Sequence, residues 1–349
     1  GAGEFLFAGL DDFEALRPAS YFRPIQEGGG IPTSDFNTLE WALYAQDSWD
    51  LTPQLNVTLG LRYDYQAFLE SPTPVVDVER AFNWRTGYSP KDTDKLSPRV
   101  MFAFDPNADG RMVFRAGAGY FYGLVPNVVA GNVLQTERPL QEVICNGSIL
   151  DGDPDAPPSP ADYGNWTIDG ADNPSTCADA GAGGVPTYTL WSEAFEYPET
   201  FKANLGFERL LSRSTRFSLD FLYSQSWNLY TVRNLNLRDA QFVLAGEDDR
   251  RVFTPEDQFN PTSANSTGSR RNLDYGDVLV NYSDGRARSF ILTTELSHNF
   301  SRSLSTSLSY TFTQAFDNSN YSCCTASGGY ADPTTGVYGP NEIGDFGDT

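Results

Sequence analysis

The sequence predicts an all-β fold, a transmembrane antiparallel β-barrel of which these 349 residues form a part with about nine strands. Three observations support this prediction. Apolar and polar residues alternate over strand-length segments, tight turns alternate with long loops, and aromatic residues gather near the ends of the predicted strands.

The composition agrees with a β protein and excludes several classes. Aromatic residues make up 14% and charged residues 20% of the chain, with 31 Gly and 22 Pro, so strand and turn residues outweigh helix formers. The net charge of -22 argues against a nucleic-acid partner, because phosphate-binding surfaces need clustered Lys and Arg. No run of about 18 apolar residues occurs, which excludes a transmembrane helix.

Residues 55–66 show the alternation most clearly. Every odd position from Leu55 to Tyr65 is apolar or aromatic, and every even position from Asn56 to Gln66 is polar, charged or Gly. A period of two places all the apolar side chains on one face of a strand, whereas a helix would scatter them around its axis. The same alternation predicts strands at 4–8, 39–46, 98–105, 111–122, 201–208, 215–224, 290–300 and 304–312.

The connections between these strands are of two kinds. Short turns at 50–54, 105–110, 210–214 and 301–303 are rich in Pro, Asn, Asp, Gly or Ser. Long segments at 9–33, 67–95, 124–198, 235–285 and from 318 onward alternate with them, so all the long loops leave on one side. This predicts short periplasmic turns and long extracellular loops. The alternative, a soluble β-sandwich with its apolar faces packed inward, does not explain the one-sided loops.

Aromatic residues near the strand ends predict two girdles at the membrane interfaces, where rings that are apolar with a polar tip are favoured. The predicted girdle residues are Tyr63, Tyr65, Tyr120, Tyr122, Tyr223 and Tyr310 on the long-loop side, and Trp49, Phe104 and Phe300 on the turn side.

Charged residues occupy the opposite face of the predicted strands. A Lys or Arg that faced lipid at mid-bilayer would cost about 2–4 kcal/mol, so this face is expected to line the lumen. The predicted lumen-facing residues are Arg62, Asp64, Arg115, Lys202, Glu208, Asp220 and Glu295. Each is better explained as a solvated or paired group of the lumen wall than as a ligand-binding residue.

The four cysteines, Cys145, Cys177, Cys323 and Cys324, all fall in predicted loops and are candidates for disulfides in an oxidising compartment. Three pairings are possible. Cys145 with Cys177 is preferred, because a bridge between adjacent cysteines would be strained, and free thiols stay as an alternative.

The sequence predicts no catalytic site and no cofactor. The single histidine, His298, lies in a predicted strand, and no CxxC pair occurs, which argues against zinc and against a histidine-dependent triad. Asp151, Asp153 and Asp155 are similar to the start of a calcium loop. Ala156 replaces the glycine that such a loop requires, so an ordinary acidic loop is the favoured interpretation. We therefore expect a protein that is not an enzyme.

Several of these segments resemble the barrel of TonB-dependent receptors. The matching phrases are LYAQDSW at 43–49, LGLRYD at 59–64, SPRV at 97–100, FRAGAGYFY at 114–122, NLGFER at 204–209 and SYTFT at 309–313. Their order and spacing are similar to the Oar-like branch of that family, over roughly residues 36–318. The resemblance implies a barrel of about 22 strands in the outer membrane of a Gram-negative bacterium. It also implies an N-terminal plug and a TonB box.

The chain opens at Gly1 without a signal peptide and contains no segment similar to the plug, the TonB box or the C-terminal closing strands. We therefore expect residues 1–349 to form part of a single outer-membrane β-barrel domain. The expected function is TonB-dependent uptake of a ligand that the extracellular loops capture. The alternatives are a structural or protein-export component of the outer membrane, with a protein partner there, and a passive porin. Expected partners are outer-membrane lipid and the TonB complex, reached through the N-terminal part.

Overall fold

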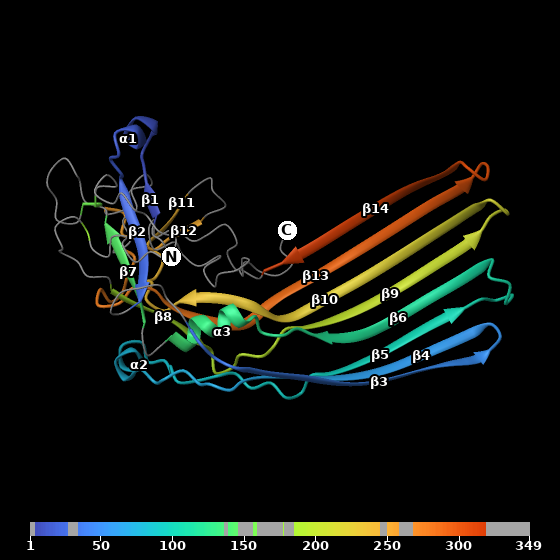
Figure 1. Cartoon of the computed structure of the whole chain (residues 1–349), viewed down its shortest axis with the longest axis horizontal. Coiled ribbons are helices and arrows are strands. Elements are labelled where there is room, and N and C mark those ends of the chain that lie inside the picture. Colours follow the sequence, from blue (N-terminus) through green and yellow to red (C-terminus); the bar gives the residue numbers. More distant parts are fainter. Residues whose placement is uncertain are drawn as a thin grey trace.

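Eight long strands form one antiparallel sheet in the computed structural model, which describes residues 4–26, 34–135, 139–145, 156–158, 177, 185–244, 250–257 and 268–318 (Figure 1). Each pairs with the next in the described part of the chain: β3 (Thr38–Thr52), β4 (Leu55–Phe68), β5 (Leu96–Phe104), β6 (Met112–Tyr122), β9 (Glu199–Leu210), β10 (Thr215–Asn234), β13 (Val278–Asn299) and β14 (Ser305–Asp317). The edge strands β3 and β14 do not pair with each other, so the sheet is open. The all-β prediction is confirmed, and an open sheet agrees with a partial barrel.

The tight turns all lie at one end of this sheet, called here the turn end, and the long connections lie at the other, the loop end (Figure 1). In the turn between β5 and β6, Gly110 has a φ of 68°, which a glycine adopts without strain. The Asp105 carboxylate accepts a hydrogen bond of 2.6 Å from the Gly110 amide, which closes the turn. The predicted one-sided arrangement of loops is therefore present.

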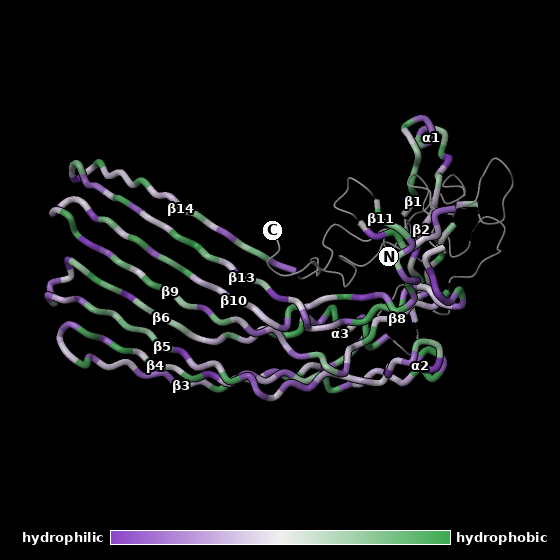
Figure 2. Tube along the Cα trace, turned by 180° about the vertical axis from the view of Figure 1, so that it is seen from behind, coloured by the Kyte–Doolittle hydropathy of each residue, from purple (hydrophilic) through white to green (hydrophobic). Residues whose placement is uncertain are grey.

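The register of the sheet places the predicted apolar positions of the eight strands on one face, called here the apolar face; the other is the polar face. Phe114 of β6, for example, lies opposite Phe104 of β5 on one side and Phe207 of β9 on the other. The strand traces in Figure 2 alternate between hydrophobic and hydrophilic residues along their length. A slip of one residue would exchange the two faces of a strand, so the shared face depends on the period-two pattern in every strand.

The apolar face is not packed into a protein core. Leu59 is 45%, Phe102 44% and Leu308 74% exposed. Among the buried hydrophobic residues of the described segments, only Val57 lies outside the loop end. A β-sandwich would bury these side chains against a second sheet. Their exposure therefore contradicts the sandwich alternative.

At the loop end the sheet branches at β13 and continues into a row of shorter strands. β10 and β13 continue beyond their neighbours, and β8 (Val185–Trp191) pairs in parallel with the start of β13. This row continues from β8 through β7 (Leu140–Cys145), β2 (Ser20–Gln26) and β1 (Glu4–Leu6). A separate two-stranded sheet pairs β11 (Phe242–Leu244) with β12 (Arg250–Val252). The strand predicted at 4–8 thus forms as β1 but pairs with β2 and does not join the row of eight long strands. It is too short for a membrane strand, which needs about 9–11 residues.

Three short helices lie in segments that the sequence predicts to be loops: α1 (Leu10–Glu14), α2 (Val76–Phe82) and α3 (Asn127–Leu134). None of the helices in the described part is long and apolar enough to cross a membrane. Val78 of α2 packs with Leu190, Val278 and Val280, so the connection between β4 and β5 reaches across to β8 and β13. α3 contributes Val129, Ala130 and Val133 to a core with Trp191, Phe195, Tyr197 and Tyr230. The buried core of the described residues therefore lies at the loop end.

Candidate functional site

The polar face of the sheet is the candidate functional surface, because it carries most of the charged residues of the long strands. Arg115 of β6, Glu208 of β9 and Arg216 of β10 lie side by side on it. Arg115 Nη1 is 3.2 Å from Glu208 Oε2, and Arg216 Nε is 3.3 Å from Glu208 Oε1. Pairs as exposed as these contribute about 0–1 kcal/mol each, so they fix side-chain positions more than they stabilise the sheet.

The other predicted lumen residues share this face. Arg62 and Asp64 pair along β4, with Arg62 Nη2 2.7 Å from Asp64 Oδ1. Lys202 lies opposite Gly119 and Ser224, Asp220 opposite Gly206 and Thr293, and Glu295 opposite Ser218 and Ser309. The structure therefore pairs Arg115 with Glu208 and Arg62 with Asp64. Within the described residues, Lys202, Asp220 and Glu295 form no ion pair.

Two cations share one aromatic ring on the polar face. Arg99 Cζ lies 4.3 Å and Lys202 Nζ 5.5 Å from the centroid of the Phe121 ring. Neither cation forms an ion pair within the described residues. The prediction missed Arg99 and Phe121, although both occupy polar positions of the alternating pattern. An aromatic residue at such a position is the signal that could have identified them.

The polar face is tied to the loop-end core through Gln66, a buried residue near the end of β4. Its Oε1 accepts a hydrogen bond of 2.8 Å from the Val125 amide, and its Nε2 donates to the Val125 carbonyl at 3.0 Å. The same Nε2 donates to Glu40 Oε1 at 2.9 Å. Gln66 thus anchors the segment that leads into α3 against the polar face.

A buried lysine lies beside this anchor, just before β5. Lys95 Nζ is 3.4 Å from the centroid of the Tyr197 ring and has no hydrogen-bond partner among the described residues. Burial lowers the pKa of Lys95 to about 8, and the nearby carboxylates, Asp92 first, act in the opposite direction. Burial also raises the pKa of Asp92, which accepts a hydrogen bond of 3.1 Å from the Tyr197 amide. This charge cluster joins the connection before β5 to the segment before β9.

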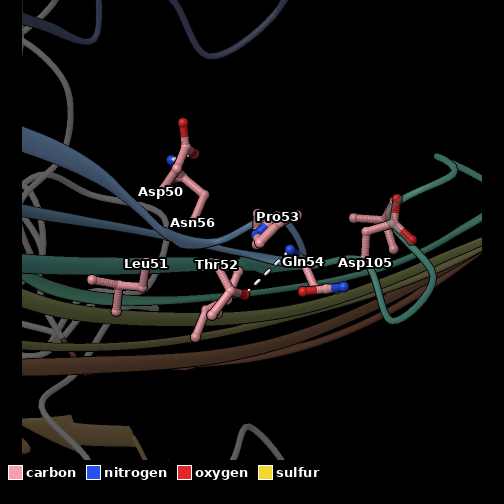
Figure 3. Close-up of a pocket in the computed structure, with 10 residues that line it drawn as sticks. Asp50, Leu51, Thr52, Pro53, Gln54, Asn56 and Asp105 are labelled. Carbon is pink, nitrogen blue, oxygen red and sulfur yellow. Dashed lines mark hydrogen bonds between the residues drawn. The ribbon is translucent and has the colours of Figure 1, made fainter.

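A cavity of about 660 Å³ lies at the turn end, where the turn between β3 and β4 meets β5 and β6 (Figure 3). Asn56 Nδ2 donates to Asp50 Oδ1 at 2.8 Å, and Asp105 is engaged by the turn amides of Asn107 and Gly110. Within the described residues, no group of three or more His, Cys, Asp or Glu side chains is arranged to hold a metal ion. We assign no ligand to this cavity.

Aromatic rings form two rows on the apolar face, one near each end of the strands. Tyr120 and Phe201 are 5.3 Å apart in the loop-end row, and Phe114 is 5.0 Å from Phe207 and 6.5 Å from Phe104 in the turn-end row. Phe114 and Tyr120 are six residues apart, about 20 Å along a strand, which is close to the height of an apolar membrane band. The predicted girdle residues that occupy apolar-face positions are Trp49, Tyr63, Tyr65, Phe104, Tyr120, Tyr122, Tyr223, Tyr310 and, directly after β13, Phe300.

The disulfide in the described segments joins Cys145, at the end of β7, to Cys177, with a Cα–Cα distance of 5.5 Å. Both cysteines are buried in a small core with Tyr21, Ile25 and Val143. This is the pairing that the sequence analysis prefers. Cys323 and Cys324, and the calcium candidates Asp151, Asp153 and Asp155, lie outside the described residues.

The single histidine lies at the turn end of β13, on the apolar face. His298 Nδ1 and Thr215 Oγ1 are 2.8 Å apart, and the His298 and Phe300 ring centroids are 4.4 Å apart. These contacts account for the residue as a cross-strand packing group, and they include no carboxylate that could orient the imidazole for catalysis.

Comparison with known proteins identifies the family. The family model described as "Outer membrane beta barrel domain" matches residues 17–343. No curated protein matches the chain in sequence.

Among solved structures, the outer membrane transporter YddB from Escherichia coli is similar, with a TM-score of 0.47 and 10% identity over 86% of this chain and 29% of that chain. The FrpB iron transporter from Neisseria meningitidis is also similar, with a TM-score of 0.41 and 9% identity. The match covers 85% of this chain and 30% of that chain. The siderophore receptor PirA from Pseudomonas aeruginosa has a TM-score of 0.38 and 14% identity. Its match covers 80% of this chain and 37% of that chain. The chain thus spans between 29% and 37% of the length of these proteins.

Proposed function

The chain belongs to the outer membrane β-barrel domain family, and we propose that it is the barrel portion of a TonB-dependent transporter of the Oar-like branch. The protein is located in the bacterial outer membrane, where the exposed apolar face meets lipid. In the proposed orientation, the turn end faces the periplasm and the loop end faces the medium. The loops capture a solute, and the inner-membrane TonB complex supplies the energy for its uptake.

One observation carries this proposal: the sheet has an uncovered apolar face and a charged polar face. Contact with lipid stabilises the apolar face, because about 25 cal/mol is gained for each Å² of apolar surface removed from water. The opposite face must then border water or protein in the lumen, because charges such as Arg115 and Glu208 would be costly in hydrocarbon. A lumen lined with charges supports passage of a polar solute.

The arrangement at the loop end favours gated uptake over a passive pore. Gln66 and Lys95 tie the polar face to α3 and to Tyr197, and these contacts belong to a continuous buried core. A segment held over the polar face in this way would restrict diffusion through the lumen. A porin needs an open channel, so we place the porin alternative below regulated transport.

Comparing the spent growth medium of three bacterial strains tests the proposal. The strains carry the full-length protein with TonB, lack the protein, or lack TonB, and mass spectrometry measures which solutes each strain removes from the medium. Energised uptake predicts at least one solute that only the first strain depletes. Depletion that needs the protein but not TonB would refute the energised mechanism and favour a porin. Identical depletion in all three strains, together with a stoichiometric protein partner after purification, would favour the structural or export role.

A further inference from the structure

The apolar face contains a recess that no side chain of the sheet fills. It has a volume of about 410 Å³ and lies over β5, β6, β9 and β10. Its floor is at Ala116, whose small side chain stands between Phe102 and Leu205 in the register. Phe114 and Phe207 form the side of the recess toward the turn end. The recess therefore follows from one small residue within a surface of large apolar side chains.

The part of the turn-end rim beside β9 and β10 is basic, although the chain as a whole carries a net charge of -22 and the turn between β5 and β6 carries Asp105 and Asp109. Arg209 occupies the next apolar-face position beyond Phe207, opposite Met112 and Phe217. It is exposed and makes no ion pair within the described residues, whereas Arg216, on the other face, pairs with Glu208. The following turn, 211–214, adds Arg213 and contains no acidic residue. An unpaired guanidinium thus lies next to an apolar recess, on the face that meets lipid.

We propose that an anionic glycerophospholipid of the periplasmic leaflet occupies this surface. One acyl chain lies in the recess above Ala116, and the lipid phosphate contacts Arg209. The charges are complementary, and a guanidinium forms two parallel hydrogen bonds with a phosphate. The position suits the lipid, because Arg209 lies beyond the turn-end aromatic row, at the depth where head groups are found. The proposal rests on the orientation of the barrel in the membrane and does not require that the protein transports a solute.

Native mass spectrometry of the full-length protein, released from outer membranes in mild detergent, tests the proposal. Phosphatidylglycerol is the anionic probe and phosphatidylethanolamine the zwitterionic one. Ala116→Leu fills the recess, Arg209→Gln removes the charge, and Arg302→Gln removes a rim arginine in the turn between β13 and β14, away from the recess. The far-ultraviolet circular dichroism of each variant checks that the barrel is folded. Arg209→Gln changes only an exposed side chain, so it keeps the test informative should Ala116→Leu fail to fold.

We expect the wild type and Arg302→Gln to retain phosphatidylglycerol in preference to phosphatidylethanolamine. Arg209→Gln should lower the retained phosphatidylglycerol about fivefold, the effect of losing about 1 kcal/mol from one cation at an anionic surface. Ala116→Leu should lower retention of both lipids. Equal retention by the wild type, Arg209→Gln and Ala116→Leu would overturn the proposal, as would equal binding of the two lipids to the wild type. A protein that co-purifies on this face in place of lipid would also overturn it.

Discussion

At the scale of single residues, the position of a side chain on one face or the other decides its role. Arg209 and Glu208 are neighbours in β9, yet Glu208 bridges two arginines on the polar face while Arg209 lies on the apolar face near the turn end. The sequence pattern is sufficient to separate such neighbours. It could not reveal the cluster of Lys95, Asp92 and Tyr197, because these residues come from two connections that only tertiary packing brings together.

Lys95 makes the stability of the loop-end segment dependent on pH. Its pKa of about 8 in the folded protein lies below its usual value of 10.5, so the unfolded segment binds more protons between these two pH values. The destabilising effect of the buried charge is fully present below about pH 8 and is lost as the pH rises to about 10.5. The protection of the Tyr197 amide against hydrogen exchange, corrected for the intrinsic exchange rate, should therefore increase over this pH range.

The matched variants for this prediction are Lys95→Met and Lys91→Met, the second at an exposed lysine of the same connection. Lys95→Met should abolish the increase in protection, and Lys91→Met should preserve it. A rise of the same size in all three proteins would show that Lys95 is not the responsible group.

At the scale of elements, apolar-face and polar-face residues alternate along each long strand over the run that the sequence predicts. Leu205 and Asn204 of β9 are adjacent, but Leu205 lies opposite Ala116 on the apolar face and Asn204 opposite Gly117 on the polar face. Leu205→Arg should destabilise the full-length protein in lipid vesicles by about 2–4 kcal/mol, the cost of a cation that faces lipid. Asn204→Arg should change stability by less than about 1 kcal/mol. Denaturant titration followed by tryptophan fluorescence measures both values, and equal losses would contradict the assignment of the two faces.

The eight long strands could be predicted from the sequence because each one carries its own period-two signal, which requires no knowledge of its neighbours. The loop-end elements lack such a signal. α2 and α3 are short, and Val78 and Val129 are buried by packing against distant segments. Strand β8 pairs in parallel with β13, far along the chain, and such a pairing leaves no local pattern. Predictions therefore succeeded where periodicity dictates structure and failed where tertiary contacts do.

At the scale of the whole molecule, the loop end and the sheet are stabilised differently. The loop end contains buried cores, and one of them surrounds the Cys145–Cys177 disulfide. The long strands are stabilised by backbone hydrogen bonds between neighbouring strands and by the contact of the apolar face with its surroundings. The barrel portion and the β2–β7 pair should therefore respond separately to perturbation.

Reduction of the disulfide tests this separation. The bridge closes a segment of 32 residues, so its loss should destabilise the β2–β7 region by about 3–4 kcal/mol. The paired variant Cys145→Ser with Cys177→Ser should be cleaved readily by protease in this region, while the eight-stranded sheet keeps its circular dichroism signal. Loss of the sheet together with the bridge would contradict the separation.

The central claim is that the apolar face meets lipid and the polar face meets water. Single spin labels along β4 test this claim most directly. Each label is placed at one of the successive positions from 55 to 63, in the full-length protein that carries Cys323→Ser and Cys324→Ser. The labelled proteins are measured in lipid vesicles. We predict that collision with oxygen, which concentrates in lipid, is high at odd positions such as Leu59, and that collision with a water-soluble nickel chelate is high at even positions such as Thr58. Reversed alternation, or equal accessibility at neighbouring positions, would contradict the account.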